Sequence, residues 1–377
     1  MLKYFVFIFL IINCSFSFAQ SNLFTSQEIK DTAQFPSLIS SIRITQPLDF
    51  CGEPFSFNDP EVRESMEKEL LLILWDRAQV ILWIKRCGRY MPYIEQVLKA
   101  NNMPGDLKYV AIIESALRPH AGSSKGAMGF WQFIRSTGLK YGLRIDRNID
   151  ERRSLFTSTI AAAKYFKKLY ADFGSWTLAA AAYNMGEHGL ARRIEEQKTK
   201  DYAHLYIPVE TQRYVYRILA VKLILSDLKK YGFHLTKNDL YPPLSFDRVS
   251  LNYSEPLPIQ LIAEAASTYF KTIKDMNPQI RGNYLVSGTH SILIPKGASK
   301  KFHSRLAPLA KNYYAENIKK KKSKSTKRRQ SLYRVKKGDS LTGIANKFHI
   351  KLADLLRWNR LRYNSPIHPG QHLIIKK

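Results

Sequence analysis

The chain has 377 residues, of which 45% are hydrophobic and 12% aromatic. A chain of this length and composition is expected to fold as two or three globular domains, which excludes wholesale disorder, a collagen-like chain and a purely coiled-coil chain. The 59 Lys and Arg residues exceed the 31 Asp and Glu residues, and the formal net charge of +28 indicates an anionic partner or anionic surroundings.

Residues 1–19 have the pattern of a secretory signal. A basic residue is followed by an apolar run over residues 5–12, and small residues precede Gln20. We therefore expect cleavage after Ala19 and export to the periplasm or cell envelope. The run is shorter than the roughly 20 apolar residues that a membrane-spanning helix needs. The alternative is a lipoprotein signal cleaved before Cys14, which would give a peripheral association with the outer membrane.

Removal of the signal would leave two cysteines, Cys51 and Cys87, in a compartment where disulfides persist. We expect a disulfide between them, and the alternative is a pair of buried free thiols. Three cysteines without histidines at ligand spacing argue against a zinc site. No metal or other cofactor is therefore expected.

The segment 20–75 is expected to lead into the first domain, because four prolines between residues 36 and 60 break any long helix there. From Glu61 onwards, apolar residues recur at three- and four-residue spacing and predict a long amphipathic helix up to Pro92. Further helices are predicted over residues 93–100, 106–117, 130–141, 157–173, 176–183 and 209–230. This pattern predicts a mainly α domain over residues 76–235, which excludes a doubly wound sheet.

The C-terminal third contains an internal repeat, which predicts two copies of one small module over residues 245–298 and 331–377. The matched residues, 82 positions apart, are Ile262 and Ile344, Ala263 and Ala345, Asn277 and Asn359, and Gly288 and Gly370. Each copy is expected to form a short strand, two short helices and a return strand. In the second copy, Asp339 or Ser340 is expected to cap the first helix.

A basic linker over residues 299–330 is expected to separate the two modules. Eight of the eleven residues from Lys319 to Arg329 are basic and none is apolar. Such a run predicts a solvated, disordered spacer. Nucleic acid is disfavoured as its partner, because the chain has an export signal and the run has no interleaved aromatic residues.

Glu114 ends an apolar helical stretch that begins at Tyr109. Apolar surroundings favour the neutral form of a carboxylic acid, so Glu114 is a candidate proton donor near neutral pH. The alternative interpretation is an ordinary glutamate on the polar face of a helix.

Four motifs occur in order around this residue, namely Glu114-Ser115, Gly129-x-x-Gln132, Ala182-Tyr183-Asn184-x-Gly186 and Glu210-Thr211-x-x-Tyr214-Val215. With these motifs the chain resembles the lytic transglycosylases of the goose-lysozyme-like superfamily. The resemblance implies a mainly α, lysozyme-like catalytic domain with a saccharide groove. It also implies cleavage of the bond between N-acetylmuramic acid (MurNAc) and N-acetylglucosamine (GlcNAc) in peptidoglycan, without water and with a 1,6-anhydro product.

The same resemblance supplies roles for individual residues. Glu114 matches the catalytic acid and base, and Gln132 and Asn184 match polar groups that hold the sugar. Tyr183 and Tyr214 are expected to line the groove, and either Ser123 or Ser124 to hydrogen-bond the acid. Met128 and Trp131 lie inside the glycine-containing motif, where they either contact substrate or pack beneath the groove.

The second C-terminal module resembles a LysM domain, a binder of glycans that contain N-acetylglucosamine. The resemblance rests on the residues from Val335 to Ala345, together with Asn359 and Gly370. It implies glycan contacts from Gly338, Asp339, Ser340 and Leu341. The first module carries Pro256-Leu257 in place of Gly338-Asp339, so it is either a degenerate LysM-like unit or a structural spacer. Small α+β (βααβ) modules are therefore expected to follow the helical domain.

Two other functions remain open from the sequence. A hydrolytic muramidase of the same fold would need an oriented water and usually a second carboxylate near Glu114. A catalytically silent wall-binding protein would be indicated by the loss of Glu114 or Asn184, and both residues are present.

Overall fold

The structure is a computed structural model that describes residues 36–44, 47–327 and 331–375, including their side chains except those of residues 320–331. The predicted signal over residues 1–19 lies outside the described residues. The chain divides into two compact units, which meet in sequence between Leu244 and Ser245. Among the described helices, none has the length and apolar character needed to cross a membrane.

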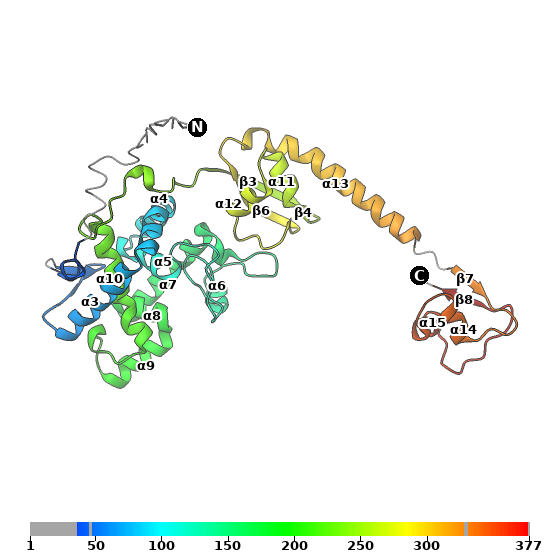
Figure 1. Ribbon diagram of the computed structural model, residues 1–377, viewed down its shortest axis with the longest axis horizontal. Helices are drawn as coiled ribbons and strands as arrows, with labels where there is room; N and C mark the ends of the chain where they lie inside the picture. The colour runs from blue at the N-terminus through cyan, green and yellow to red at the C-terminus, as the bar shows by residue number, and fades with distance from the viewer. Residues whose placement is uncertain (1–35, 45–46, 328–330, 376–377) are drawn as a thin grey trace, which may run out of the picture. The chain divides into compact units, whose positions relative to one another are not determined.

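The first unit begins with short elements and two long helices (Figure 1). These are α2 (Leu38–Ile42), the hairpin of β1 (Leu48–Phe50) and β2 (Glu53–Phe55), α3 (Pro60–Trp75) and α4 (Arg77–Ala100). The prediction of one helix from Glu61 to Pro92 is wrong in two places. The helix is interrupted at Asp76, and α4 continues beyond Pro92 to Ala100. Asp76 leaves the helical conformation and caps α4 by accepting the amide of Gln79 at 3.1 Å. Pro92 lies inside α4, between the buried Met91 and the nearby buried Ile94.

Shorter helices complete the first unit. They are the 3₁₀ turn η1 (Gly105–Leu107), α5 (Lys108–Ser115), α6 (Arg135–Lys140), η2 (Glu151–Arg153), α7 (Leu155–Phe173), α8 (Trp176–Met185), α9 (Glu187–Gln197), η3 (Tyr202–His204), α10 (Val209–Ser226) and η4 (Lys237–Asp239). The predicted mainly α fold is confirmed. The helix predicted over residues 130–141 begins only at Arg135, and α9 was not predicted.

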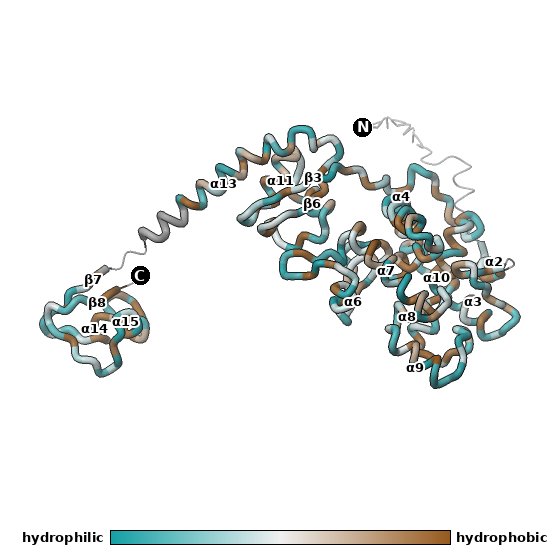
Figure 2. Tube along the Cα trace, turned by 180° about the vertical axis from the view of Figure 1, so that it is seen from behind, coloured by the Kyte–Doolittle hydropathy of each residue, from teal (hydrophilic) through white to brown (hydrophobic). Residues whose placement is uncertain are grey.

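The core of the first unit forms where α8 packs between α7 and α10. Every side chain of α8 from Leu178 to Ala182 is buried, and its four alanines allow the neighbouring helices to approach closely. Helix α10 buries residues around most of its circumference, as expected of a helix enclosed by others. Figure 2 shows hydrophobic and hydrophilic residues interleaved along the helices of this unit.

The segment expected to lead into the domain is part of the same core from Leu48 onwards. Helix α3 packs against α10 and buries Val62, Met66, Leu70 and Leu74. These side chains belong to one hydrophobic cluster with the residues of α5, α8 and α10. The structure therefore has no boundary at residue 75 or 76.

The second unit contains the two predicted modules. The first pairs β3 (Phe246–Tyr253) antiparallel with β6 (Gly288–Pro295) and places α11 (Ile259–Ala265) and α12 (Phe270–Met276) between them in sequence. The second pairs β7 (Ser331–Arg334) antiparallel with β8 (His372–Ile375) around α14 (Leu341–Lys347) and α15 (Leu352–Asn359). The predicted βααβ order is confirmed in both. The first module adds a small pair, β4 (Leu257–Pro258) with β5 (Tyr284–Leu285), that the sequence did not indicate.

The repeated asparagine has the same role in both modules. Asn277 at the end of α12 donates its Nδ2 to the Leu293 carbonyl at 2.7 Å and accepts the Leu293 amide at 2.9 Å. Asn359 donates to the Ile374 carbonyl at 2.9 Å and accepts the Ile374 amide at 2.6 Å. Each asparagine side chain thus bonds the backbone N–H and carbonyl of one residue in the return strand, as a neighbouring strand would. This shared contact supports the repeat found in the sequence.

The prediction of a disordered linker is wrong over most of its length, because helix α13 runs over Ser299–Lys327. Its first half packs on the first module through Phe302, Leu306 and Ala310, which are all buried and lie four residues apart. Anchored apolar turns at one end allow a helix to continue into a polar sequence. Residues 328–330 lie outside the described residues.

Candidate active site

Glu114 lies in the last turn of α5, where the chain leaves the helix sharply. Ala116 and Leu117 both have positive φ, of 52° and 57°, so the chain reverses directly after the helix. The buried Ser115 hydroxyl bonds the Phe130 carbonyl at 2.8 Å and joins this turn to the loop over residues 121–133. Two consecutive non-glycine residues in the left-handed region are strained, and such strain concentrates at functional sites.

Tyr214 from α10 holds the carboxyl of Glu114. Its hydroxyl lies 2.5 Å from Glu114 Oε1, and its ring is only 1% exposed. Burial raises the pKa of Glu114 to about 7, whereas the hydrogen bond from Tyr214 and the charge of Arg217 favour the carboxylate, and Glu210 favours the acid. A carboxyl with this pKa is present in both protonation states near neutral pH. It is therefore able to donate a proton and later accept one.

The loop over residues 121–133 packs tightly at Gly129. This residue has a φ of 83°, and a Cβ built on it would lie 1.8 Å from the backbone oxygen of Arg152. Only glycine fits there. The Gln132 side chain donates to the carbonyls of Ala121 and Gly129 at 3.0 and 2.8 Å, so it closes the loop from within.

Neither Ser123 nor Ser124 hydrogen-bonds Glu114 in the described structure. The Ser123 hydroxyl instead accepts the amide of Ala127 at 3.2 Å, within its own turn. The hydroxyl that was expected from these serines comes from Tyr214. Both serines are exposed, so they remain candidate substrate contacts only.

Tyr183 and Asn184 end α8 beside this site. The Tyr183 hydroxyl donates to the Trp131 carbonyl at 2.6 Å, and its ring stacks on Phe166 with centroids 4.6 Å apart. Burial and the nearby Glu114 raise the pKa of Tyr183 well above its usual range, so the phenol stays protonated. Asn184 Oδ1 accepts the Thr211 hydroxyl at 2.8 Å, which fixes the amide against α10.

Trp131 and Met128, which were expected either to contact substrate or to pack beneath the groove, differ in burial. Trp131 is 1% exposed and donates its indole N–H to Thr159 at 3.0 Å, so it packs in the core. Met128 is partly exposed and pairs through its backbone with Gly122 and Phe133.

Arg217 and Glu210, which influence the pKa of Glu114, were not singled out from the sequence. Arg217 lies three residues after Tyr214 and Glu210 four residues before it, and this spacing on one helix face was the available signal.

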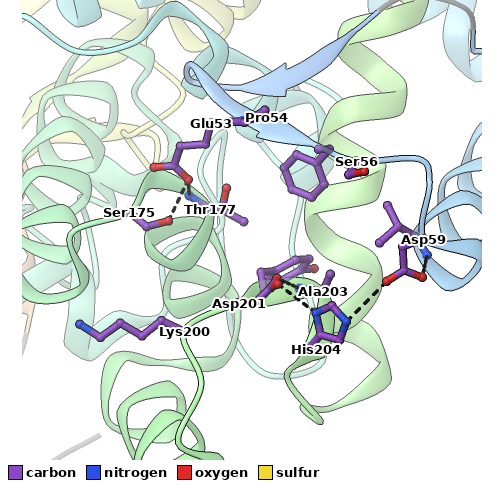
Figure 3. Close-up of a pocket in the computed structure, with 13 residues that line it drawn as sticks. Glu53, Pro54, Ser56, Asp59, Ser175, Thr177, Lys200, Asp201, Ala203 and His204 are labelled. Atoms are coloured by element: carbon purple, nitrogen blue, oxygen red, sulfur yellow. Dashed lines mark hydrogen bonds and ion pairs between the residues drawn. The ribbon is translucent and has the colours of Figure 1, made fainter.

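A separate pocket of the first unit contains none of the predicted site residues (Figure 3). In it, the carboxylate of Glu53 accepts the Ser175 hydroxyl at 2.8 Å and the Thr177 amide at 3.0 Å, at the N-terminus of α8. His204 lies between two carboxylates, 2.9 Å from Asp201 and 3.5 Å from Asp59. These contacts connect the N-terminal hairpin to the start of α8 and η3 to the start of α3.

The expected disulfide is absent, since Cys51 and Cys87 are both free and partly buried. Cys51 lies in the β1–β2 turn with a φ of 57°, and its amide donates to Asp106 at 2.8 Å. Cys87 lies within α4, where burial raises the pKa of its thiol to about 12. Each side chain packs separately against the core of the first unit. No group of three His, Cys, Asp or Glu side chains among the described residues is arranged to hold a metal ion.

The four candidate residues of the second module fall into two groups. Gly338, with a φ of 91°, and Asp339 form a turn in which Asp339 accepts the Lys336 amide and the Tyr333 hydroxyl, both at 2.8 Å. Ser340 rather than Asp339 caps α14, by accepting the amide of Gly343 at 3.1 Å. Leu341 is 8% exposed and belongs to the module core.

Comparisons with known proteins identify two domains in the chain. A family model for the transglycosylase SLT domain matches residues 91–206, and one for the LysM domain matches residues 333–376. The fold and the site thus define an SLT-type transglycosylase with a C-terminal LysM domain. Membrane-bound lytic murein transglycosylase D of Escherichia coli K12 is 34% identical over 340 residues, which cover 86% of this chain and 72% of that protein. The chain belongs to the family of this lytic transglycosylase, whose members are lyases.

Two further similarities are more local. The peptidoglycan transglycosylase gp16 of Escherichia phage T7 is 34% identical over 136 residues, which cover 35% of this chain and 10% of that protein. The crystal structure of the 70 kDa soluble lytic transglycosylase of Escherichia coli aligns with a TM-score of 0.34 and 19% identity. That alignment covers 47% of this chain and 32% of the other.

Proposed function

We propose that this enzyme cleaves the bond between MurNAc and GlcNAc in peptidoglycan and leaves 1,6-anhydroMurNAc ends. The observation that carries the proposal is the half-buried Glu114, held by Tyr214 and with a pKa raised to about 7 by burial. Membership of the lytic transglycosylase family supports the reaction class.

In the proposed reaction, Glu114 acts twice. The acid protonates the glycosidic oxygen as the bond from that oxygen to C1 of MurNAc breaks, and the N-acetyl group of MurNAc assists at C1. The resulting Glu114 carboxylate then takes the proton of the C6 hydroxyl, and the C6 oxygen bonds to C1. The anhydro ring closes without water, and Glu114 returns to its acid form.

The other acidic residues that the sequence offers near Glu114 are held in ion pairs or hydrogen bonds, which supports a mechanism with Glu114 as its single acid. Asp150 forms a buried ion pair with Arg152 at 2.8 Å, and Asp106 pairs with Lys222 at 2.8 Å. Asp146 and Glu151 are likewise engaged with Arg144, through its side chain and its amide. Hydrolytic muramidases usually need a second carboxylate at about 5 to 9.5 Å from the acid. Glu210, which influences the pKa of Glu114, is the residue that such a mechanism would use.

We propose that glycan binding accompanies cleavage. The turn at Gly338, Asp339 and Ser340 is the proposed contact of the LysM domain, and the first module is a degenerate copy with Pro256-Leu257 at that place. The basic net charge would favour encounters with the carboxylates of peptidoglycan stem peptides. The N-terminal pattern supports export to the periplasm or cell envelope, with peripheral outer-membrane attachment through Cys14 as the alternative.

The test is mass spectrometry of the products from purified peptidoglycan treated with the wild type, Glu114→Gln and Glu210→Gln. We expect anhydroMurNAc ends from the wild type and from Glu210→Gln, and none from Glu114→Gln, because an amide cannot protonate the leaving oxygen. Reducing ends that depend on Glu210 would show a muramidase instead. Intact glycan from all three proteins, with binding retained, would leave only the wall-binding function.

A further inference from the structure

A pocket of about 440 Å³ adjoins the candidate active site. Its lining comes from α3, α4, α5 and α10 and includes Leu72, Trp83, Ile113, Glu210, Arg213 and Arg217. Ile113 directly precedes Glu114, and Tyr214, which bonds Glu114, lies between Arg213 and Arg217 in the sequence. The pocket therefore opens next to the acid without including it.

Most charged groups of this pocket already have partners. Arg213 donates to both oxygens of Glu69, with Nη2 3.1 Å from Oε2, and the Glu69 side chain is only 2% exposed. The Asp76 carboxylate accepts the amide of Gln79. Glu210 lies 3.8 Å from the ammonium of Lys125. These pairs leave one lining cation to be accounted for.

That cation is Arg217. It is partly buried, yet within the described residues it has neither a hydrogen bond nor an ion pair. Its charge nevertheless acts on Glu114. A guanidinium has five N–H donors in a planar fork that matches a carboxylate, and a partly buried one without an acceptor is unfavourable. The lining beside it includes apolar groups of Leu72, Trp83 and Ile113.

We propose that Arg217 binds a carboxylate that the substrate carries beside the MurNAc at the cleavage point, so that this pocket selects strands by their acidic substituents. The proposal rests on the proposed function, because it takes the sugar at Glu114 to be MurNAc. Two carboxylates have the right chemistry: that of the lactyl group, which is free when the peptide is absent, and those of the stem peptide. The apolar walls favour the stem peptide, whose side chains bring methyl and methylene groups.

The test is binding to the Glu114→Gln protein, which needs no turnover. The ligands are a peptidoglycan tetrasaccharide with free stem-peptide carboxylates, the same compound with those carboxylates amidated, and the peptide-free tetrasaccharide. We expect amidation to weaken binding about tenfold, since a hydrogen bond to a charged group contributes that much. In Glu114→Gln/Arg217→Gln amidation should have no effect. Arg217→Lys should retain part of the discrimination.

A matched control is Arg192→Gln, which removes an exposed arginine of α9 in the same background and should leave the discrimination unchanged. Peptide-free ligand that binds more tightly than both peptide forms, through Arg217, would assign the lactyl carboxylate, and peptide-free ligand that binds like the amidated form would assign the stem peptide. Equal binding of all three ligands, discrimination that persists in the Arg217→Gln protein, or no binding of the free ligand would each overturn the proposal.

Turnover separates this role from a purely electrostatic one. In the active background, Arg217→Gln should lower the ratio of kcat/KM for the free peptide form to kcat/KM for the amidated form about tenfold, in addition to any equal change in both that follows from the pKa of Glu114. A parallel loss on both substrates, with a displaced pH profile, would mean that Arg217 acts only on Glu114 and would overturn the proposal. Hydrolytic products from the wild type would refute the proposed reaction but leave the binding result valid.

Discussion

Glu114 is subject to opposing influences on its pKa. Burial raises the pKa to about 7, and the Tyr214 hydroxyl and the Arg217 guanidinium restrain that rise. Because the net effect places the pKa near neutrality, small changes in either neighbour alter the protonated fraction at working pH. The hydrogen bond also fixes the carboxyl in one orientation, which would benefit the proposed protonation of one particular oxygen.

Tyr214→Phe should raise the pKa of Glu114 further, because it removes a hydrogen bond to the carboxylate and leaves the burial in place. Activity that needs the acid form is lost as pH rises through the pKa. The alkaline limb of the kcat/KM profile should therefore move to higher pH. The maximal rate should fall at least about tenfold, since the carboxyl loses its orienting partner. The measurement is the rate of anhydro product formation between pH 4 and 9.

Tyr141→Phe is the matched control, because the buried Tyr141 hydroxyl has no hydrogen-bond partner among the described residues. It should keep both the rate and the pH profile of the wild type. An unchanged profile in Tyr214→Phe would contradict the role assigned to this hydroxyl.

Helix α8 connects two parts of the first unit. Its N-terminus is capped by Glu53 from the hairpin, and its C-terminus carries Tyr183 and Asn184. A carboxylate that accepts several donors at a helix N-terminus satisfies free backbone groups and complements the helix dipole. The N-terminal hairpin thereby helps to position residues at the opposite end of the helix.

Glu53→Ala should lower the free energy of unfolding of the first unit by about 1–3 kcal/mol, because the donors at the start of α8 lose their acceptor. Denaturant unfolding followed by circular dichroism provides the measurement. Glu64→Ala, at an exposed position of α3, is the control and should change stability by less than about 0.5 kcal/mol. A stability loss no larger than the control would show that solvent replaces Glu53 at the cap.

Across the whole chain, the features that could be predicted from the sequence were those that produce a periodic or repeated pattern of residues. The mainly α first unit and both βααβ modules follow from local patterns, and the four motifs placed Glu114, Tyr183, Asn184 and Tyr214 in one unit. Contacts between distant segments were less accessible. The serines near Glu114 in the sequence do not bond it, whereas Tyr214, one hundred residues away, does.

The remaining errors have related causes. The linker was taken as disordered from its charge, but its apolar turns at Phe302 and Leu306 anchor a helix that continues into the basic run. The disulfide between Cys51 and Cys87 was inferred from cysteine number and compartment, which say nothing of the positions of the two side chains. Packing geometry decided both outcomes, and no local pattern reports it.

Asn359→Ala tests the second module as a folding unit. It removes the hydrogen bonds that join α15 to β8, and it should destabilise the module by about 1–3 kcal/mol, since partly buried backbone groups of the return strand lose their partner. Hydrogen exchange of the Ile374 amide should accelerate, and binding of the full chain to purified peptidoglycan should weaken. Asn346→Ala, at an exposed position of α14, is the control. Unchanged exchange at Ile374 would contradict this role for Asn359.

The shared asparagine separates the part of each module that maintains its fold from the part proposed to contact glycan. Asn277 and Asn359 make the same bonds to the return strand, although the turn before the first helix has diverged between the copies. Ligand preference can therefore drift in one duplicate without loss of folding. Replacing Pro256-Leu257 in the first module by the turn of the second module should therefore change the ligand that the first module binds, while Asn277 preserves its fold.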